Sequence, residues 1–231
     1  MPTIRAWQFT VPVSSGLENS MHLSTSVPVP SISDTQLLIE VHSTAFNPAD
    51  YKIVEVLLLS RAELPSQCIL GMKFAGKVAA IGSKLAGFSL GEWVFGTLCE
   101  IQRRGNLAMF IVVEHNMLVK MPHHMELVQF AGVGAVGLTA YQAIVLHVEK
   151  GSRDRVFVNG GSGGMGVFSI QIAKALGCYV TATCSTTNVG FCKCLVADEV
   201  LNYKEVEVDN VGSSADSYYP AARSLYRLAQ E

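Results

Sequence analysis

Long hydrophobic runs are missing from this sequence. No apolar stretch reaches the ~18 residues that a membrane-spanning helix needs. The N-terminal residues from Met1 to Trp7 also lack the apolar core of a secretory signal peptide. We therefore expect no membrane as a partner and predict a cytoplasmic protein.

Clustered charge of either sign is also absent. Only 16% of the 231 residues are charged, the 17 Lys and Arg residues are scattered, and the net charge is −2. A nucleic-acid surface needs grouped basic side chains, so nucleic acid is not expected as a partner. The apolar residues make up 49% of the chain, which is enough to form the core of one large or two modest domains.

The cysteines do not have the spacing of a disulfide framework. They fall in or beside apolar segments, which favours reduced thiols. Cys192 and Cys194 cannot by themselves complete a tetrahedral zinc site, and they are expected to lie on a helix. The full set is Cys68, Cys99, Cys178, Cys184, Cys192 and Cys194.

The sequence does contain two strand-like stretches separated by a glycine-rich loop and a helix. Arg155–Asn159 and Tyr179–Thr183 are short, apolar and β-branched, as buried strands are. Between them, Val167–Leu176 has apolar residues at helical spacing, and Gly177 ends it. This order of elements predicts one half of a dinucleotide-binding fold.

The glycines before that helix follow the pattern G-x-G-x-x-G at Gly161, Gly163 and Gly166. The first glycine permits a tight turn, the second lets the backbone approach a pyrophosphate, and the third lets the helix pack on the strand. Phosphates would lie at the helix N-terminus, where free N–H groups and the helix dipole favour negative charge. Because glycines also serve ordinary turns, the prediction of a dinucleotide site depends on the flanking strands.

The end of the second strand indicates which dinucleotide binds. An NAD site usually carries Asp or Glu about 20 residues beyond the glycines. Here no carboxylate follows the strand, and the residues in its place are Ser185, Thr186, Thr187 and Asn188. Their hydroxyl and amide groups can donate to a 2′-phosphate, although Ser, Thr and Asn also cap helices well. The missing acid favours NADPH over NADH.

The N-terminal half has the pattern of short strands punctuated by glycine turns. Such a pattern is typical of an irregular barrel. His42 is interpreted as a structural histidine on one of these strands, and His123 and His124 as part of a solvated loop. Strand signals occur at residues 4–11, 21–25, 36–44, 71–78, 93–96 and 110–113, and a long helical region follows from 127 to 148.

The Asn47–Lys52 segment allows two interpretations. Asn-Pro favours a turn, and in the first interpretation Asp50 simply begins a helix near its positive end. Alternatively, Tyr51 or Lys52 donates a proton or a hydrogen bond in a cleft. The residues alone favour the first interpretation.

Together these motifs resemble the medium-chain dehydrogenase/reductase superfamily, in its zinc-independent quinone-oxidoreductase and enoyl-reductase branch. The fungal members, including trans-acting enoyl reductases of polyketide pathways, look most similar. The motifs follow the family order from residue 4 to about 205, at residues 47–52, 74–78, 91–96, 137–143, 160–166, 182–185 and 197–203.

The resemblance implies an α/β protein with two domains. A GroES-like irregular β-barrel would form the catalytic domain at residues 1–122, and an incomplete Rossmann domain, a partial doubly wound parallel sheet, would bind NADPH at residues 123–205. Residues 206–231 would be a divergent tail. The active site would lie in the cleft between the domains, and homodimer formation is left open.

The resemblance also implies hydride transfer from NADPH to a quinone or an α,β-unsaturated carbonyl, on a small-molecule or carrier-bound enoyl substrate. Lys52, with Asn47 and Tyr51, would lie by the nicotinamide and the substrate oxygen, and Thr139 would face the same cleft. The expected pyrophosphate contacts are Ser162, Gly163, Gly164 and Met165, and the expected 2′-phosphate contacts are Ser185, Thr186, Thr187, Asn188 and Tyr203.

Several residues depart from the pattern of that superfamily. Phe46 and Met72 stand where zinc-dependent relatives place ligands, so no metal is expected. Lys73 replaces an acid found in many relatives, and Val196 replaces a usual glycine. The resemblance stops near residue 206, before the second mononucleotide half. A C-terminally truncated, inactive remnant or an interaction module is therefore the alternative to an active reductase.

Overall fold

The computed structural model describes residues 2–10, 16–52, 67–98, 105–122, 126–151 and 153–206. The predicted loop at His123 and His124, Cys99 and most of the predicted tail at residues 206–231 lie outside these ranges. The chain divides into two compact units, one formed by residues 1–135 and the other beginning at Val136. No helix in the described ranges is long and apolar enough to cross a membrane.

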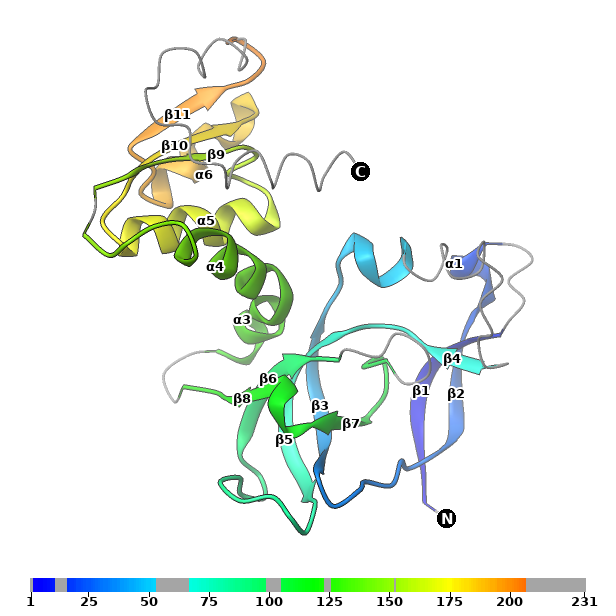
Figure 1. The fold of residues 1–231 in the computed structure, drawn as a ribbon. Coiled ribbons are helices and arrows are strands. Elements are labelled where there is room, and N and C mark those ends of the chain that lie inside the picture. The colour runs from blue at the N-terminus through cyan, green and yellow to red at the C-terminus, as the bar shows by residue number, and fades with distance from the viewer. Residues whose placement is uncertain are drawn as a thin grey trace. The chain divides into compact units, whose positions relative to one another are not determined.

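The first unit consists mainly of antiparallel strands in two sheets (Figure 1). The smaller sheet has the order β2-β1-β4 and the larger one the order β7-β3-β5-β6-β8. The small-sheet strands are β1 (Thr3–Thr10), β2 (Met21–Pro28) and β4 (Gln67–Ile69). The others are β3 (Gln36–Ala45), β5 (Lys73–Ile81), β6 (Trp93–Thr97), β7 (Phe110–Glu114) and β8 (Leu118–Lys120).

The segment before β7 joins these two sheets. Ala6 and Ala108 form an isolated bridge, and the Trp7 N–H donates to the Leu107 carbonyl oxygen over 2.8 Å. On the other side, the Val41 N–H of β3 donates to the Met109 carbonyl oxygen over 2.9 Å. One short segment therefore pairs with both sheets, as in an irregular barrel, which confirms the predicted fold of this half.

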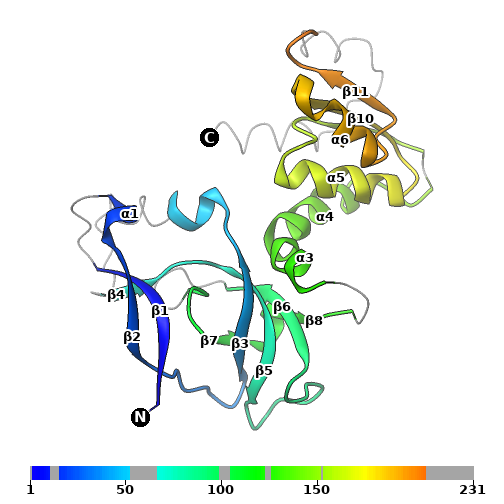
Figure 2. The same ribbon diagram turned by 180° about the vertical axis from the view of Figure 1, so that it is seen from behind.

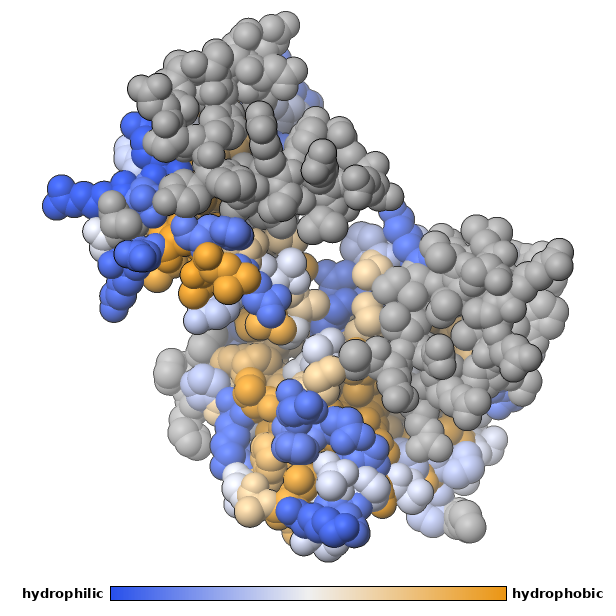
Figure 3. Space-filling view, in the orientation of Figure 1, coloured by the Kyte–Doolittle hydropathy of each residue, from blue (hydrophilic) through white to orange (hydrophobic). Residues whose placement is uncertain are grey.

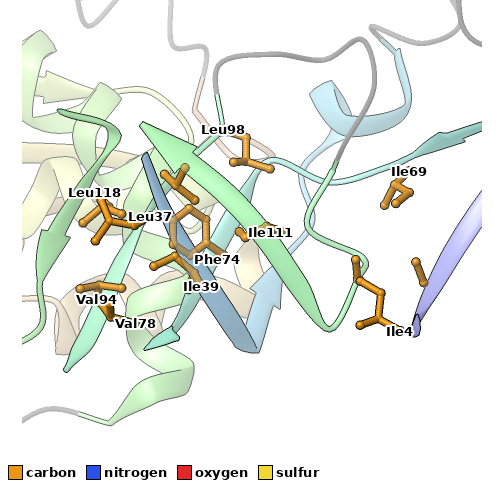
Figure 4. Packing of buried hydrophobic residues seen from close by; sticks show 13 residues of the cluster. Ile4, Leu37, Ile39, Ile69, Phe74, Val78, Val94, Leu98, Ile111 and Leu118 are labelled. Atoms are coloured by element: carbon orange, nitrogen blue, oxygen red, sulfur yellow. The ribbon is translucent and has the colours of Figure 1, made fainter. Parts of the chain in front are cut away.

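A hydrophobic core fills the space between the sheets. Figure 4 shows the Phe74 ring lying among Leu37, Ile39 and Ile111, and all four side chains are almost completely buried. Alternate residues of each strand supply this core because side chains on a strand point to opposite faces in turn. Burial of a large apolar side chain stabilises the fold by about 1.5–3 kcal/mol.

Helical segments complete the first unit. These are α1 (Leu17–Ser20), the 3₁₀-helix η1 (His115–Met117), α3 (Leu127–Gly132) and a turn over residues 48–52 that follows β3. Phe130 of α3 packs on Phe95 of β6, with ring centroids 4.5 Å apart. The predicted helical region from 127 to 148 is confirmed, but a five-residue π-helix, η2 (Val133–Gly137), separates α3 from α4.

The second unit has the predicted strand–loop–helix–strand order. Its three-stranded parallel sheet has the order β11-β10-β9, as in one half of a doubly wound fold. Figures 1 and 2 show α5 between this sheet and α4. The elements are α4 (Leu138–Val145), β9 (Arg155–Val158), α5 (Gly164–Ala175), β10 (Tyr179–Cys184), η3 (Thr186–Asn188), α6 (Val189–Cys194) and β11 (Glu199–Asn202).

The described surface of each unit is mixed in character. Figure 3 shows hydrophilic residues beside hydrophobic ones in both units.

His42, interpreted as structural, lies on the surface of β3 with its Nε2 3.4 Å from a Glu40 carboxylate oxygen. Its ring also meets the Trp93 ring edge-on, with centroids 4.9 Å apart. The histidine therefore belongs to a local polar and aromatic contact.

Candidate functional site

The glycine loop between β9 and α5 is held by Thr183 of the neighbouring strand. The Gly160 N–H donates to Thr183 Oγ1 over 2.9 Å, and the Gly161 N–H donates to the Thr183 carbonyl oxygen over 2.7 Å. The same hydroxyl donates to the Asn159 side-chain oxygen over 2.7 Å. Gly160 has φ 75°, in the left-handed region that favours glycine. Thr183 thus fixes the direction in which the loop leaves the sheet, a role not predicted from the sequence.

Two of the three pattern glycines are required by close packing. A Cβ on Gly166 would overlap the Gly160 carbonyl oxygen, and a Cβ on Gly161 would lie 2.9 Å from the Ala182 Cβ. A Cβ on Gly163 would meet only the Gly160 carbonyl oxygen, at 3.2 Å. Gly161 and Gly166 therefore let α5 approach the sheet, while Gly163 leaves exposed backbone.

The N-terminus of α5 has no side-chain cap. Gly163 is the N-cap residue, it makes no side-chain capping bond, and no acidic residue lies in the first turn. The first backbone N–H groups of a helix have no partner within the helix. A 12-residue helix whose start is uncapped presents these donors and the positive end of its dipole to an anion.

Uncharged polar side chains gather beside this loop. Asn188 Nδ2 donates to Ser162 Oγ over 3.1 Å and to Ser185 Oγ over 3.2 Å. The Ser185 and Thr187 hydroxyls lie 3.3 Å apart. The structure therefore brings together four of the predicted site residues, Ser162, Ser185, Thr187 and Asn188, which we call the hydroxyl–amide cluster.

The remaining nucleotide-side predictions lie near this cluster or on α4. Thr186 Oγ1 accepts from Asn202 Nδ2 over 2.9 Å, which ties η3 to the end of β11. The Tyr203 N–H donates to the Cys184 carbonyl oxygen over 3.1 Å, and its side chain is exposed. Gly164 and Met165 form the first turn of α5. Thr139 lies exposed on α4, the helix that packs on α5.

Two buried thiols lie beneath the glycine loop. Cys184 of β10 and Cys192 of α6 are buried, and Cys192 Sγ would lie 3.3 Å from a Cβ on Gly161. Burial, followed by the hydrogen bond and charge of Cys184, raises the pKa of Cys192 to about 11. Because the thiolate is the reactive form, Cys192 acts here as a small apolar core residue. The prediction that Cys192 and Cys194 share a helix is confirmed.

In the first unit, the predicted catalytic residues share one helical turn. Asn47 precedes the turn, Pro48 begins it, and the Asn47 N–H donates to the Asp50 carboxylate over 2.6 Å. This bond from the third helical residue back to the N-cap is one half of a capping box, and proline suits the first helical position. Tyr51 and Lys52 follow with exposed side chains.

A buried ion pair anchors that turn. The Lys73 ammonium lies 3.1 Å from Asp50 Oδ2, and both side chains are at most 3% exposed. The Lys73 carbonyl oxygen accepts from Thr44 Oγ1 over 2.9 Å and from Asn106 Nδ2. Sequence reasoning noted Lys73 as a departure and placed Asp50 at a helix start, but it did not pair them. Asn106 was missed entirely.

Phe46 and Met72 lie at the two positions where zinc-dependent relatives would place ligands. Phe46 is 59% exposed, and neither its ring nor the Met72 thioether replaces the thiolate or imidazole that zinc sites use. The next residue, Lys73, adds a buried positive charge. Within the described ranges, no three His, Cys, Asp or Glu residues come together to hold a metal. These residues do not fit a zinc ion.

Comparison with known proteins places this chain in a family. Residues 33–123 match the alcohol dehydrogenase GroES-like domain family. A trans-enoyl reductase of Aspergillus terreus is 37% identical over 242 residues, which cover 95% of this chain and 68% of the relative. The chain belongs to the medium-chain dehydrogenase/reductase superfamily. This confirms the resemblance described from its motifs.

Other members of the superfamily agree with this assignment. A chloroplast envelope quinone oxidoreductase homolog of Arabidopsis thaliana is 34% identical and is covered over 63% of its length. The structure of a quinone oxidoreductase from Coxiella burnetii has a TM-score of 0.77 at 29% identity, covering 93% of this chain and 66% of that one. The chain therefore spans about two thirds of the length of these relatives.

Proposed function

We propose that this chain is an NADPH-dependent reductase that delivers hydride to a quinone or an α,β-unsaturated carbonyl. The observation that carries the proposal is the uncapped start of α5 beside the hydroxyl–amide cluster. Relatives named as a trans-enoyl reductase and as quinone oxidoreductases support the reaction class. A carrier-bound enoyl substrate and homodimer formation stay predictions.

The residues of the glycine loop fit the diphosphate of a dinucleotide. The backbone from Ser162 to Met165 would surround it, with N–H groups at the start of α5 as donors. Thr183 supports this arrangement because it already occupies the Gly160 and Gly161 N–H groups. The Gly163 N–H is likewise occupied, by the Gly160 carbonyl oxygen over 2.9 Å, so the N–H groups of the first turn of α5 would be the donors to a ligand.

The hydroxyl–amide cluster supports NADPH over NADH. An acid would accept from the ribose 2′-hydroxyl of NADH, but a carboxylate repels a 2′-phosphate. The Ser185 and Thr187 hydroxyls can instead donate hydrogen bonds to phosphate oxygens while the Asn188 amide holds Ser185, and bonds to a charged partner are worth about 1.5–3 kcal/mol. Tyr203, exposed at the end of β11, can add a further donor.

In the first unit, we assign the stabilisation of developing charge to the Asn47–Lys52 turn. The nicotinamide ring supplies the hydride when it is bound. Hydride addition to an enone pushes negative charge onto the carbonyl oxygen. The exposed Lys52 ammonium or the Tyr51 hydroxyl would donate to that oxygen, and Asn47 would help to orient the reacting groups. Donors aimed at such charge lower the barrier most in the transition state.

We further propose that the reaction needs no zinc. The zinc-dependent route polarises a carbonyl with a metal ion, but Phe46 and Met72 do not provide its ligands, and the Lys73 ammonium would repel it. A cationic or phenolic donor on the Asn47–Lys52 turn would supply the same polarisation. Elemental analysis of the purified chain should therefore find no stoichiometric zinc, whereas one zinc per chain retained after mild chelation would contradict this.

The function is tested by turnover of the purified chain with NADPH and with NADH, using one quinone and one enone as acceptors. We expect acceptor-dependent NADPH oxidation. Ser185→Asp should abolish the preference for NADPH, because a carboxylate then faces the 2′-phosphate. Thr35→Asp adds the same negative charge on an exposed loop of the first unit and should leave the preference intact. Absence of turnover with either cofactor would instead favour a non-catalytic module.

A further inference from the structure

The Asp50–Lys73 ion pair is an unusual feature of the first unit. The two side chains are 2% and 3% exposed, and their charged groups lie 3.1 Å apart. Removing two charges from water is costly unless each finds a partner. The pair is also incompletely satisfied, because Asp50 Oδ1 is buried without a hydrogen-bond partner in the part of the chain that the structure describes. An apolar pair would fill the same space at less cost, so the charges call for an explanation.

Asp50 connects Lys73 to the predicted catalytic turn. The carboxylate oxygen that meets the Lys73 ammonium also accepts the Asn47 N–H over 2.6 Å. The Asp50 N–H in turn donates to the Asn47 carbonyl oxygen over 2.9 Å. Lys73 therefore fixes the Asp50 carboxylate oxygen that closes the turn through its hydrogen bond with the Asn47 N–H. Tyr51 and Lys52 follow Asp50 directly in the chain.

Lys73 is itself held firmly at the start of β5. Its carbonyl oxygen accepts from Thr44 of β3 and from the Asn106 amide. Asn106 occupies the space in which a Cβ on Gly71 would lie, and Gly71 has φ 96°, so a larger residue is excluded there. The ammonium is thus attached to a rigid strand and points at the turn.

We propose that Lys73 is a positioning residue for the Asn47–Lys52 turn: by pairing with Asp50, it fixes the turn that presents Tyr51 and Lys52. The proposal rests on the proposed function for its catalytic consequence, but not for its structural one. The ion pair costs desolvation, and in return it sets the position of two exposed donors, Tyr51 and Lys52. A misplacement of about 1 Å at a reacting group can lower turnover by about 100-fold.

The first test is amide hydrogen exchange by NMR in Lys73→Met, which removes the ammonium but keeps a long side chain. Exchange of the Asn47 N–H should accelerate at least about tenfold more than exchange of the Val41 N–H, which belongs to β3 and measures the general loss of stability. Lys77→Met is the matched control, since Lys77 lies on the same strand but over the Trp93 ring, at 4.6 Å. Equal acceleration at Asn47 and Val41 in Lys73→Met would overturn the proposal.

The second test is a kinetic double-mutant cycle of Lys73→Met and Asp50→Asn. Turnover at saturating cofactor should fall about 10- to 100-fold in Lys73→Met, while the Kd of NADPH stays within about twofold. Because Lys73 acts through Asp50, adding Lys73→Met to Asp50→Asn should change turnover by no more than about twofold. Independent, multiplying losses would overturn the proposal.

The two tests separate the two hypotheses. If the parent chain turns over no acceptor, the proposed function fails, while the exchange measurement at Asn47 still decides the role of Lys73. If Lys73→Met does not fold, Asp50→Asn is compared with the double variant, in which no buried charge is left unpaired. A double variant about tenfold slower than Asp50→Asn would then overturn the proposal, and equal rates would support it.

Discussion

The two helix starts that carry the predicted site are built in opposite ways. The start of α5 in the second unit has a glycine N-cap and no side-chain cap, so no side chain occupies the N–H donors of its first turn. The turn at residues 48–52 in the first unit is closed by its own Asp50 carboxylate, whose charge is balanced by buried Lys73. The start of α5 can therefore receive an anion from a ligand. At residues 48–52 the Asp50 carboxylate already occupies the Asn47 N–H, so the Tyr51 and Lys52 side chains are the groups available to a substrate.

This difference shows how helix ends can serve binding or positioning. At α5 the backbone is the functional part, and glycine keeps it open. At residues 48–52 the backbone donor is satisfied internally, and the exposed Tyr51 and Lys52 side chains are the functional part. The two sites should therefore be sensitive to different mutations. The start of α5 should be damaged by added side-chain volume, and the turn at residues 48–52 by the loss of a buried charge.

The largest expected effect is the loss of stability when the ion pair at the turn of residues 48–52 is broken. Lys73→Met leaves the Asp50 carboxylate buried without its partner, and breaking such a pair costs about 3–5 kcal/mol of unfolding free energy. Trp7 and Trp93 are the only tryptophans and both lie in the first unit, so tryptophan fluorescence in urea measures this unit. Lys77→Met should cost at most about 1 kcal/mol, the scale of an exposed cation–π contact. Equal losses in the two variants would contradict the importance of the ion pair.

The next largest effect is the loss of stability expected when a side chain is added to a glycine at the start of α5. Gly166→Ala places a methyl group against the Gly160 carbonyl oxygen, and we expect a loss of about 1–3 kcal/mol together with weaker dinucleotide binding. Gly190→Ala in α6 is the matched control, because nothing lies within 4 Å of its added Cβ. It should be neutral or stabilising by up to about 1 kcal/mol. Unfolding followed by far-UV circular dichroism distinguishes the two, and a harmless Gly166→Ala would contradict the close packing of α5.

The less buried Lys174–Asp198 ion pair tests whether the depth of burial decides how much unfolding free energy is lost when an ion pair is broken. Lys174 lies 2.8 Å from Asp198, with side chains 26% and 28% exposed, and Asp198 also accepts the Val180 N–H over 2.6 Å. Burial raises the pKa of Asp198, but the hydrogen bonds from Lys174 and Val180 outweigh it, so the pKa is lowered overall. Asp198→Asn should cost about 1–2 kcal/mol, less than Lys73→Met.

The sign of the pH dependence follows from that lowered pKa. The contribution of Asp198 is fully present above its unfolded pKa, about 3.9, and is lost as the pH falls through the lower folded value. The stability difference between the parent and Asp198→Asn should therefore be constant near neutral pH and shrink below about pH 4. A difference that grows as the pH falls would contradict the assignment.

The smallest expected effect is a gain. Val196 has φ 61°, a left-handed conformation that a β-branched residue adopts at a cost. Val196→Gly should stabilise the second unit by about 1 kcal/mol. Val189→Gly, at a helical position with φ −58°, should instead destabilise it by a similar amount. Circular dichroism in urea gives both signs, and a loss of stability in Val196→Gly would show that the strain is absent.

The sequence predicted the elements whose pattern is local. Most strands of the first unit, the strands β9 and β10, the glycine loop and the α5 helix follow from alternation, helical spacing and glycine placement, whereas β4, β8 and β11 were not predicted. Boundaries were less accurate. α5 begins at Gly164 rather than Val167 because the loop glycines also tolerate helical backbone, and β2 continues to Pro28, beyond the predicted strand signal at residues 21–25. The α1 helix and the π-helix η2 were not predicted, since neither has a distinctive sequence pattern.

Long-range contacts were beyond prediction from one sequence. Asp50 and Lys73 are 23 residues apart, and Asn106 is a further 33 residues along, so no local rule joins them. Lys73 looked like a departure, yet the fold turns it into the partner of Asp50. The glycine replaced by Val196 was a better guide, because a usual glycine marks a left-handed position, and the structure has φ 61° there.

The most direct test of this account is calorimetric titration of the purified chain with NADPH and, separately, with NADH. The open start of α5 and the hydroxyl–amide cluster predict that both bind and that NADPH binds at least about tenfold more tightly, the value of one or two charge-assisted hydrogen bonds to the 2′-phosphate. The advantage of NADPH should shrink as salt is added. Equal or tighter binding of NADH would contradict the account.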